Sequence, residues 1–340
     1  MQTLLRRGPF AAGLICFVLL AMIAMRREGP DWTLLAGFPL AGFKTIFISI
    51  ILEAVPFILL GVLFSALLQV FVSERTVRRW TPRRPLLGVL FACSLGVLFP
   101  LCECGMIPIV RRLMRKGMPV YIAVTFILAG PILNPVVYAS TYMAFRGRPE
   151  MAYSRMALAF IVAAAIGLLI YRFVKRSPLR PESPYADRLE EESPAYGRHA
   201  VGSTRPNRFL STLGHASDEF FDMGKYFLFG AMLTALIQVA MPRESLVAVG
   251  QGEWSSHLFM LGFAYLLSLC STSDAFVASS FAATFTSGSL LTFLVFGPML
   301  DLKNTLMLLS VFRVRFVATI SALLVVAVLA GSRLFEWLVL

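Results

Sequence analysis

The chain has 340 residues, of which 58% are hydrophobic and only 15% are charged, and its mean hydropathy is +0.76. A soluble domain carries about 25% charged residues, so this composition excludes a soluble globular protein and indicates a polytopic membrane protein. The net charge of +12 comes from basic residues beside apolar segments. Topology signals and anionic lipid account for such residues, so membrane lipid is the expected partner and nucleic acid is not.

The first apolar segment, residues 10–25, follows Arg6 and Arg7 in the manner of a secretory signal. The sequence Met25-Arg26-Arg27 after it offers no small-residue cleavage site, so we expect a retained transmembrane helix. Residues 1–43 would then form this helix and its connection to the remaining chain.

Further apolar segments are near or above the roughly 17 residues needed to cross a bilayer: 44–72, 119–145, 151–171, 220–241, 289–311 and 316–332. Two pairs of shorter segments behave differently. Residues 86–101 and 105–115 meet at Cys102-Glu103-Cys104-Gly105, and residues 256–270 and 274–287 meet at Ser271-Thr272-Ser273. A non-helical tip at membrane depth is tolerated when protein buries it or when it lines a cavity. We therefore interpret each pair as a re-entrant helical hairpin.

The two halves of the sequence repeat each other with a shift of 167 to 169 residues. Residues 53–76 align with residues 222–245, and Leu101-Cys102 aligns with Leu269-Cys270. Further on, the segment 130–134 (GPILN) aligns with the segment 297–301 (GPMLD). Duplicated halves with interrupted apolar helices are typical of secondary transporters.

The basic loops set the predicted orientation. Lys and Arg gather in residues 73–84, 111–116 and 172–208, and all three loops are cytoplasmic if the N-terminus is inside. The first hairpin then enters from the cytoplasm and the second from outside. The predicted fold is an all-α polytopic membrane protein with inverted-topology repeats, residues 44–171 and 220–340.

Residues 172–219 form the sizeable polar segment between the repeats. This segment contains several prolines and charges of both signs, so we expect a flexible cytoplasmic linker. A simple tether between the two halves is the favoured interpretation, with a regulatory role as the alternative.

Hairpins that enter from opposite faces bring their tips together near the midplane. The candidate substrate-binding residues lie on these tips and on the two Gly-Pro breaks with the polar residues that follow them: Cys102, Glu103, Cys104, Gly130, Pro131, Asn134, Cys270, Ser271, Thr272, Ser273, Asp274, Gly297, Pro298 and Asp301. An ionisable group at such depth is costly and therefore indicates function. Simpler alternatives remain for each kind of residue, namely cysteines as apolar filler, Glu103 in water at a shallow tip, aspartates as helix caps, and prolines as kinks.

Cys102 and Cys104 carry the sharpest chemical hypothesis. A C-x-C pair at a helix break can offer two sulfurs to one soft metal ion or arsenic centre, and Cys270 on the opposite tip could add a third. Glu103 between the two cysteines could take up the proton that a thiol releases. His199, His215 and His257 lie in or next to predicted loops without metal-ligand spacing, and we assign them no role.

Motifs of soluble enzymes are missing from the sequence. It contains no GxxxxGK[ST], no HExxH and no GxSxG, so we expect neither an enzyme nor a cofactor.

At these residues the sequence resembles a known family. The block Pro100 to Pro135 (PLCECGMIPIVRRLMRKGMPVYIAVTFILAGPILNP), with LCSTSDAF and GPMLD downstream, resembles predicted permeases of the YraQ type, which include the organoarsenical efflux permease ArsP. The likeness runs from about residue 44 to residue 332 outside the linker. It implies a permease of the bacterial inner membrane with Cys102 and Cys104 as candidate thiol ligands. Members of the family differ in substrate, so arsenical efflux does not transfer to this chain automatically.

The function expected is that of a secondary transporter that moves a small solute by alternating access, with Glu103 or Asp301 coupling transport to a proton or ion. The sharpest substrate hypothesis is a thiophilic metalloid or metal species. The alternative is a non-transporting membrane anchor or sensor subunit whose linker recruits a cytoplasmic partner. The sequence leaves open both a homo-oligomer and an accessory subunit.

Overall fold

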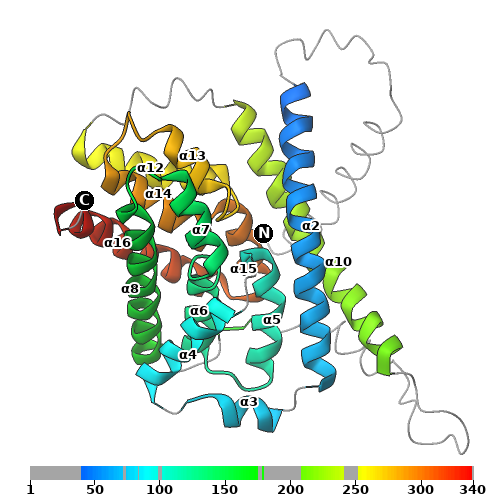
Figure 1. The fold of residues 1–340 in the computed structure, drawn as a ribbon. Coiled ribbons are helices and arrows are strands. Elements are labelled where there is room, and N and C mark those ends of the chain that lie inside the picture. The colour runs from blue at the N-terminus through cyan, green and yellow to red at the C-terminus, as the bar shows by residue number, and fades with distance from the viewer. Residues whose placement is uncertain are drawn as a thin grey trace, which may run out of the picture.

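The computed structural model describes residues 40–71, 74–82, 84–98, 102–174, 178–179, 208–240 and 252–338. Nearly all of these residues are helical (Figure 1). The helices are α2 (Leu40–Phe71), α3 (Glu74–Trp80), α4 (Pro85–Leu98), α5 (Glu103–Arg115), α6 (Val120–Ala129), α7 (Pro135–Ala144), α8 (Glu150–Phe173), α10 (Arg208–Ala240), α12 (Glu253–Leu267), α13 (Asp274–Ser280), α14 (Ser287–Met299), α15 (Leu302–Val311) and α16 (Val314–Leu338). The predicted first helix, residues 10–25, and most of the predicted linker lie outside the described residues.

Long apolar helices identify a membrane protein. Four segments are long and apolar enough to cross a bilayer: Ala41–Ser65, Glu150–Phe173, Ser287–Val311 and Val314–Leu338. Shorter apolar helices accompany them, and within the described residues the extended structure is limited to one bridge between Leu179 and Phe312. The chain is an all-α polytopic membrane protein, as its composition predicts.

The apolar segment 119–145 is two helices rather than one. Helices α6 and α7 have ten residues each, and a rise of about 1.5 Å per residue makes each about half the thickness of the hydrocarbon core. Helix α6 ends just before Gly130-Pro131, and α7 begins when the Asn134 side chain accepts the N–H of Val137 at 2.9 Å. Proline follows this cap as the first helical residue, where its missing N–H is harmless.

The second Gly-Pro pair is placed differently from the prediction. Gly297 and Pro298 lie inside the last turn of α14, and the chain leaves the helix only at Leu300. Asp301 then caps α15 by accepting the N–H of Asn304. The break therefore follows the Gly-Pro pair by two residues, because the capping aspartate and not the proline sets its position.

Each predicted hairpin position contains two helices. Helix α4 ends at Leu98 and α5 begins directly after Cys102, while the segment 268–273 separates α12 from α13. Helix α13 ends at Ser280, well before residue 287 where the prediction ended it. The Ser279 and Ser280 hydroxyls donate to carbonyls three residues back, and a run of turns follows.

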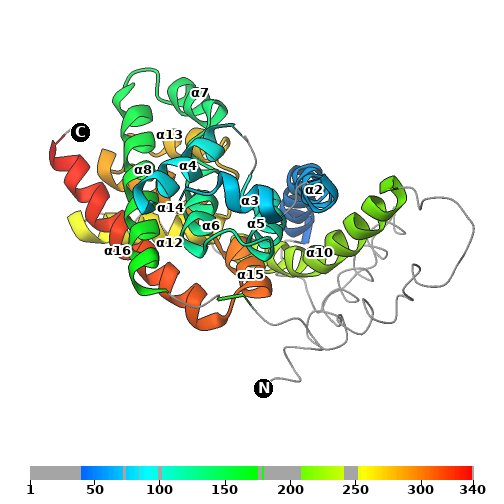
Figure 2. The ribbon, with the colours of Figure 1, turned by 90° about the horizontal axis from the view of Figure 1, so that it is seen from below.

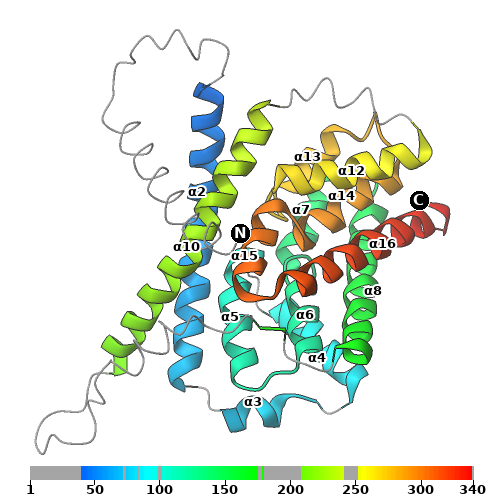
Figure 3. The same cartoon turned by 180° about the vertical axis from the view of Figure 1, so that it is seen from behind.

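The two halves have the same order of helices. The series α2, α4, α5, α6, α7 and α8 is matched by α10, α12, α13, α14, α15 and α16. Helices α4 and α5 lie at the end of the molecule beside α3, whereas α12 and α13 lie at the opposite end (Figures 1 and 3). This placement agrees with the prediction of inverted repeats whose hairpins enter from two sides.

The first helices of the two halves pack together beside the remaining bundle, as the view from below shows (Figure 2). At Gly61, α2 meets α5 so closely that a Cβ atom would overlap the backbone of Gly105. Gly230 is the repeat equivalent of Gly61 on α10, and a Cβ there would lie 3.2 Å from the Cα of Lys303 on α15. The same repeat position thus contacts α5 in one half and α15 in the other.

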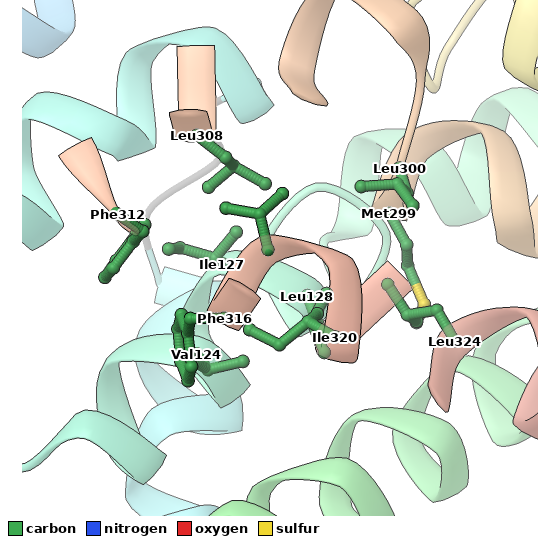
Figure 4. A pocket seen from close by; sticks show the side chains of 11 residues that line it. Val124, Ile127, Leu128, Met299, Leu300, Leu308, Phe312, Phe316, Ile320 and Leu324 are labelled. Carbon is green, nitrogen blue, oxygen red and sulfur yellow. The ribbon is translucent and has the colours of Figure 1, made fainter. Parts of the chain in front are cut away.

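The halves also pack against each other through their inner helices. Helix α5 contacts α15, α13 contacts α7, and α16 contacts α8. Between α6 and the segment α14–α16 lies a cavity of about 20 Å³ with an entirely apolar lining, ten of whose side chains are labelled in Figure 4. That volume admits about one water, but a water needs polar partners, so we expect the cavity to be dry.

Candidate functional site

Each of the two predicted hairpin tips has a carboxylate at the first residue of the helix that follows it. Cys102 is the N-cap residue of α5 and Glu103 opens that helix, while Ser273 is the N-cap residue of α13 and Asp274 opens it. Both carboxylates are buried, each with a relative exposure of 2%. The alternative that Glu103 is a solvated carboxylate at the water line is therefore wrong.

Lys303 faces the first tip from the other half of the molecule. Its Nζ atom lies 3.7 Å from Glu103 Oε1 and 3.7 Å from Asp301 Oδ2. It also donates to the Ser268 carbonyl oxygen at 3.4 Å. Ser268 ends α12 in the left-handed region, with φ of 47°, a conformation that turns the chain into the second tip and costs about 1 kcal/mol in a non-glycine residue. Lys303 thus joins groups from both halves.

Arg155 plays the matching role at the second tip. This fully buried residue of α8 binds Asp274 Oδ2 at 2.7 Å, and the same Nη2 atom donates to the Ser271 carbonyl oxygen at 3.1 Å. Its Nη1 atom donates to the Thr141 hydroxyl at 2.8 Å, which fixes the guanidinium against α7. Short charge-assisted hydrogen bonds of this kind are the strong ones.

The two ion pairs are reciprocal. Glu103 of the first half pairs with Lys303 of the second, and Asp274 of the second half pairs with Arg155 of the first. A buried charge without a partner costs several kcal/mol, so each half supplies the cation that lets the other half keep a carboxylate at its tip. The pairs therefore tie the tips to the opposite repeats.

Both cations were missed by the sequence analysis. A signal for them was present, because Arg155 and Lys303 are isolated basic residues inside the apolar segments 151–171 and 289–311. A basic residue in such a segment marks a functional site by the same rule that selected the carboxylates. What the sequence could not supply was the pairing, since 200 residues separate Glu103 from Lys303.

The predicted thiols occupy both tips. The Cys104 side chain is buried and interacts with that of Cys102, within electrostatic range of the Lys303 ammonium. Cys270 accepts a hydrogen bond from the Thr272 hydroxyl at 3.6 Å and lies within electrostatic range of Glu103. Within the described residues, no group of three or more His, Cys, Asp or Glu side chains is arranged to hold a metal ion. Convergence of all three sulfurs on one substrate therefore stays a prediction.

The remaining predicted residues surround the tips. Ser271 contributes its carbonyl to Arg155, and the Ser273 hydroxyl donates to the Cys270 carbonyl at 3.1 Å. Gly130 and Pro131 are buried, and a Cβ on Gly130 would overlap the Met106 side chain of α5. Gly130 therefore allows α5 to lie directly on the end of α6.

Asn134 and Asp301 are both helix caps. The simpler alternative for the aspartates is therefore right for Asp301, but wrong for Asp274, which follows the N-cap residue Ser273. Asn134 also borders a groove of about 580 Å³ between α4, α7 and α8, whose lining is almost wholly apolar. Asp301 is fully buried and adjoins Lys303. The equivalent caps thus differ in charge, and only the cap of the second half belongs to an ion pair.

His257 has a structural role that the sequence did not indicate. It lies within α12 and is fully buried, with Nδ1 at 2.8 Å from Thr292 Oγ1 and Nε2 at 2.9 Å from Glu336 Oε2. Thr292 is also 2.7 Å from the Ser332 hydroxyl. These bonds join α12, α14 and α16 within the second half, so His257 has a packing role that its position near a predicted loop concealed.

Comparisons with known proteins cover most of the chain. A family model described as "Predicted permease" matches residues 39–337. The chain is 47% identical over 294 residues to UPF0718 protein YcgR of Bacillus subtilis, covering 86% of this chain and 96% of that protein. It is 35% identical over 272 residues to a putative two-component membrane permease complex subunit of Streptococcus mutans, covering 80% and 87% respectively. No solved structure shows significant similarity to the chain.

Proposed function

The chain belongs to the predicted-permease family, and from this premise we propose that it is a secondary transporter whose substrate binds between the two hairpin tips. The observation that carries the proposal is the reciprocal pair of buried ion pairs, Glu103–Lys303 and Asp274–Arg155. Charged side chains buried in a membrane protein mark substrate and ion pathways. Here they come from both repeats and gather at the breaks in the helices.

Alternating access would follow from the repeats. In inverted-repeat transporters, one repeat rocks against the other around a fixed midplane site built from discontinuous helices. The broken helices α6–α7 and α14–α15 and the tips at Cys102 and Cys270 are the matching parts here. The protein would lie in a bacterial inner membrane with a cytoplasmic N-terminus, as its basic loops predict.

For the substrate we propose a small thiophilic species, a trivalent metalloid or a soft metal ion. Cys102 and Cys104 supply two sulfurs only two residues apart in the sequence. A desolvated thiol resists ionisation, so the soft cation itself would provide the positive centre that the thiolates need. Proton transfer to Glu103 would couple thiol ionisation to transport.

A second candidate function rests on one of the relatives. The Streptococcus mutans protein is named as a subunit of a two-component membrane permease complex. By analogy, this chain would need an accessory subunit to transport, or it would anchor or sense without transporting alone. The predicted linker would then be a contact site for a cytoplasmic partner.

Uptake into everted membrane vesicles tests the first proposal. Cells that lack this chain, with and without the gene restored, are first compared for sensitivity to a panel of metals and metalloids. The species that discriminates between them is then used for uptake, with and without an uncoupler. We expect uptake that the uncoupler abolishes and that falls at least tenfold in Cys102→Ser and Cys104→Ser.

Cys93→Ser is the matched control, since Cys93 is a buried thiol of α4 that borders the groove rather than the tips. Uptake that survives serine at 102, 104 and 270 would rule out a thiolate site. Vesicles that transport only when a second protein is co-expressed would favour the two-component reading.

A further inference from the structure

Lys303 is surrounded by oxygen atoms that come from three chain segments. Around its ammonium lie the carbonyl oxygen of Ser268 at the end of α12, a carboxylate oxygen of Glu103 on α5 and one of Asp301. The residue is 95% buried, because its relative exposure is 5%. Transporters use carbonyl oxygens at the ends of broken helices to coordinate a coupling Na⁺ or H⁺. Buried carboxylates in membrane proteins likewise mark ion and proton pathways.

The ammonium is held loosely. Its three contacts measure 3.4 to 3.7 Å, whereas strong charge-assisted hydrogen bonds measure about 2.7 to 2.9 Å. Arg155 provides the contrast within the same molecule, with contacts of 2.7 to 3.1 Å to three fixed partners. We call the oxygen atoms of Ser268, Glu103 and Asp301 around the ammonium the oxygen cage. Lys303 is a compact charge inside this cage, whereas Arg155 holds its partners in a fixed geometry.

The cage holds more acceptor capacity than Lys303 uses. Glu103 Oε2 is buried without a hydrogen-bond partner in the described part of the chain. Glu103 itself has a relative exposure of 2%. Two carboxylates also outnumber one ammonium, so the cage attracts positive charge.

We propose that Lys303 is a tethered cation whose ammonium fills the position, between Glu103 and Asp301, that a free Na⁺ ion would otherwise bind. This inference rests on the proposed function of the tips as a transport site. A metal cation in the cage would lie within a few ångströms of the ammonium and be repelled by it. The native protein therefore binds no Na⁺ there, and loss of the ammonium turns the cage into a Na⁺ site.

Thermal unfolding of the detergent-purified full chain tests the proposal without any transport assay. Wild type, Lys303→Met and the charge-balanced pair Lys303→Met/Asp301→Asn are heated in NaCl and in choline chloride at equal ionic strength. Lys44→Met is the matched control, because Lys44 is an exposed lysine of α2. These melting temperatures do not depend on whether the protein transports a substrate. Failure of the transport proposal can therefore be distinguished from failure of the Na⁺-site proposal.

The proposal requires a Na⁺ response in one protein alone. We expect Lys303→Met to melt about 2 to 4 °C higher in NaCl when Na⁺ is about ten times its Kd. Wild type, Lys44→Met and the charge-balanced pair should show no difference between the salts.

A Na⁺ response in wild type would overturn the proposal, and so would a folded Lys303→Met protein that melts equally in both salts. Lys303→Gln provides a second variant in case the methionine substitution prevents folding. If neither variant folds in either salt, the result also counts against the proposal, because bound Na⁺ should replace the lost positive charge and allow folding in NaCl.

Discussion

Replacing Arg155 by alanine should loosen the second hairpin tip. The substitution removes the 2.7 Å ion pair with Asp274 and the hydrogen bonds to Thr141 and the Ser271 carbonyl, and it leaves a buried carboxylate uncompensated. Removing one partner of a buried ion pair costs about 3 to 5 kcal/mol. For a chain of this size, the melting temperature should fall by roughly 5 °C or more.

The assay is the loss of the monodisperse peak on size-exclusion chromatography after heating the detergent-purified protein. Arg172→Ala, an exposed arginine on the same helix, is the control and should stay within about 0.5 kcal/mol of wild type. The double variant Arg155→Ala/Asp274→Ala should recover part of the loss, with a coupling of about 1 to 3 kcal/mol. If Arg155→Ala melts like Arg172→Ala, or if the two losses simply add, the tip is not held by this pair.

Three further predictions address packing, charge and topology. Gly61→Leu should destabilise the protein by about 1 to 3 kcal/mol in the same heating assay, because it separates α2 from α5, whereas Gly147→Leu, at an open position, should not; equal melting of the two would contradict the close contact. Asp301→Asn should keep the cap of α15 and the stability of the protein, because Asn caps a helix as well as Asp does. The variant carries no charge beside Lys303, so vesicle uptake should fall at least tenfold. Uptake equal to that of wild type would limit Asp301 to capping. Glu190→Cys in a cysteine-free background should resist an impermeant maleimide in intact cells, and ready labelling would reverse the predicted orientation.

Local sequence patterns predicted the apolar helices and the polar segments between several of them. The apolar segments predicted an all-α membrane protein, and the polar residues at 102–104 and 271–274 predicted the tips, because both are properties of short stretches of chain. The cap of α7 at Asn134 also follows from its local sequence, since Pro135 comes directly after it. The family likeness read from the C-x-C-G-x-x-P block is confirmed by the match over residues 39–337.

Long-range pairing could not be predicted in the same way. The partners of Glu103 and Asp274 lie on helices of the opposite half, and no periodicity within a segment indicates which cation reaches which carboxylate. The end of α14 was misplaced for a related reason. Proline is tolerated in a transmembrane helix when its surroundings satisfy the freed groups, so Pro298 did not stop the helix and Asp301 decided where the next one begins.

The bare contact between Gly61 and Gly105 bears on how α5 can move. Side-chain ridges that fit into grooves normally hold crossing helices at one of a few angles. At this crossing neither glycine carries a side chain, so no interlocking ridge fixes the angle there. The hydrogen bond from the Ser65 hydroxyl to the Pro108 carbonyl oxygen instead holds α5 in place along α2. Gly230 lies against Lys303 and the Leu306 side chain at the start of α15, so only one side of that contact lacks a side chain. The helices that carry Glu103 and Lys303, α5 and α15, therefore each pack against a glycine of the first helix of one half.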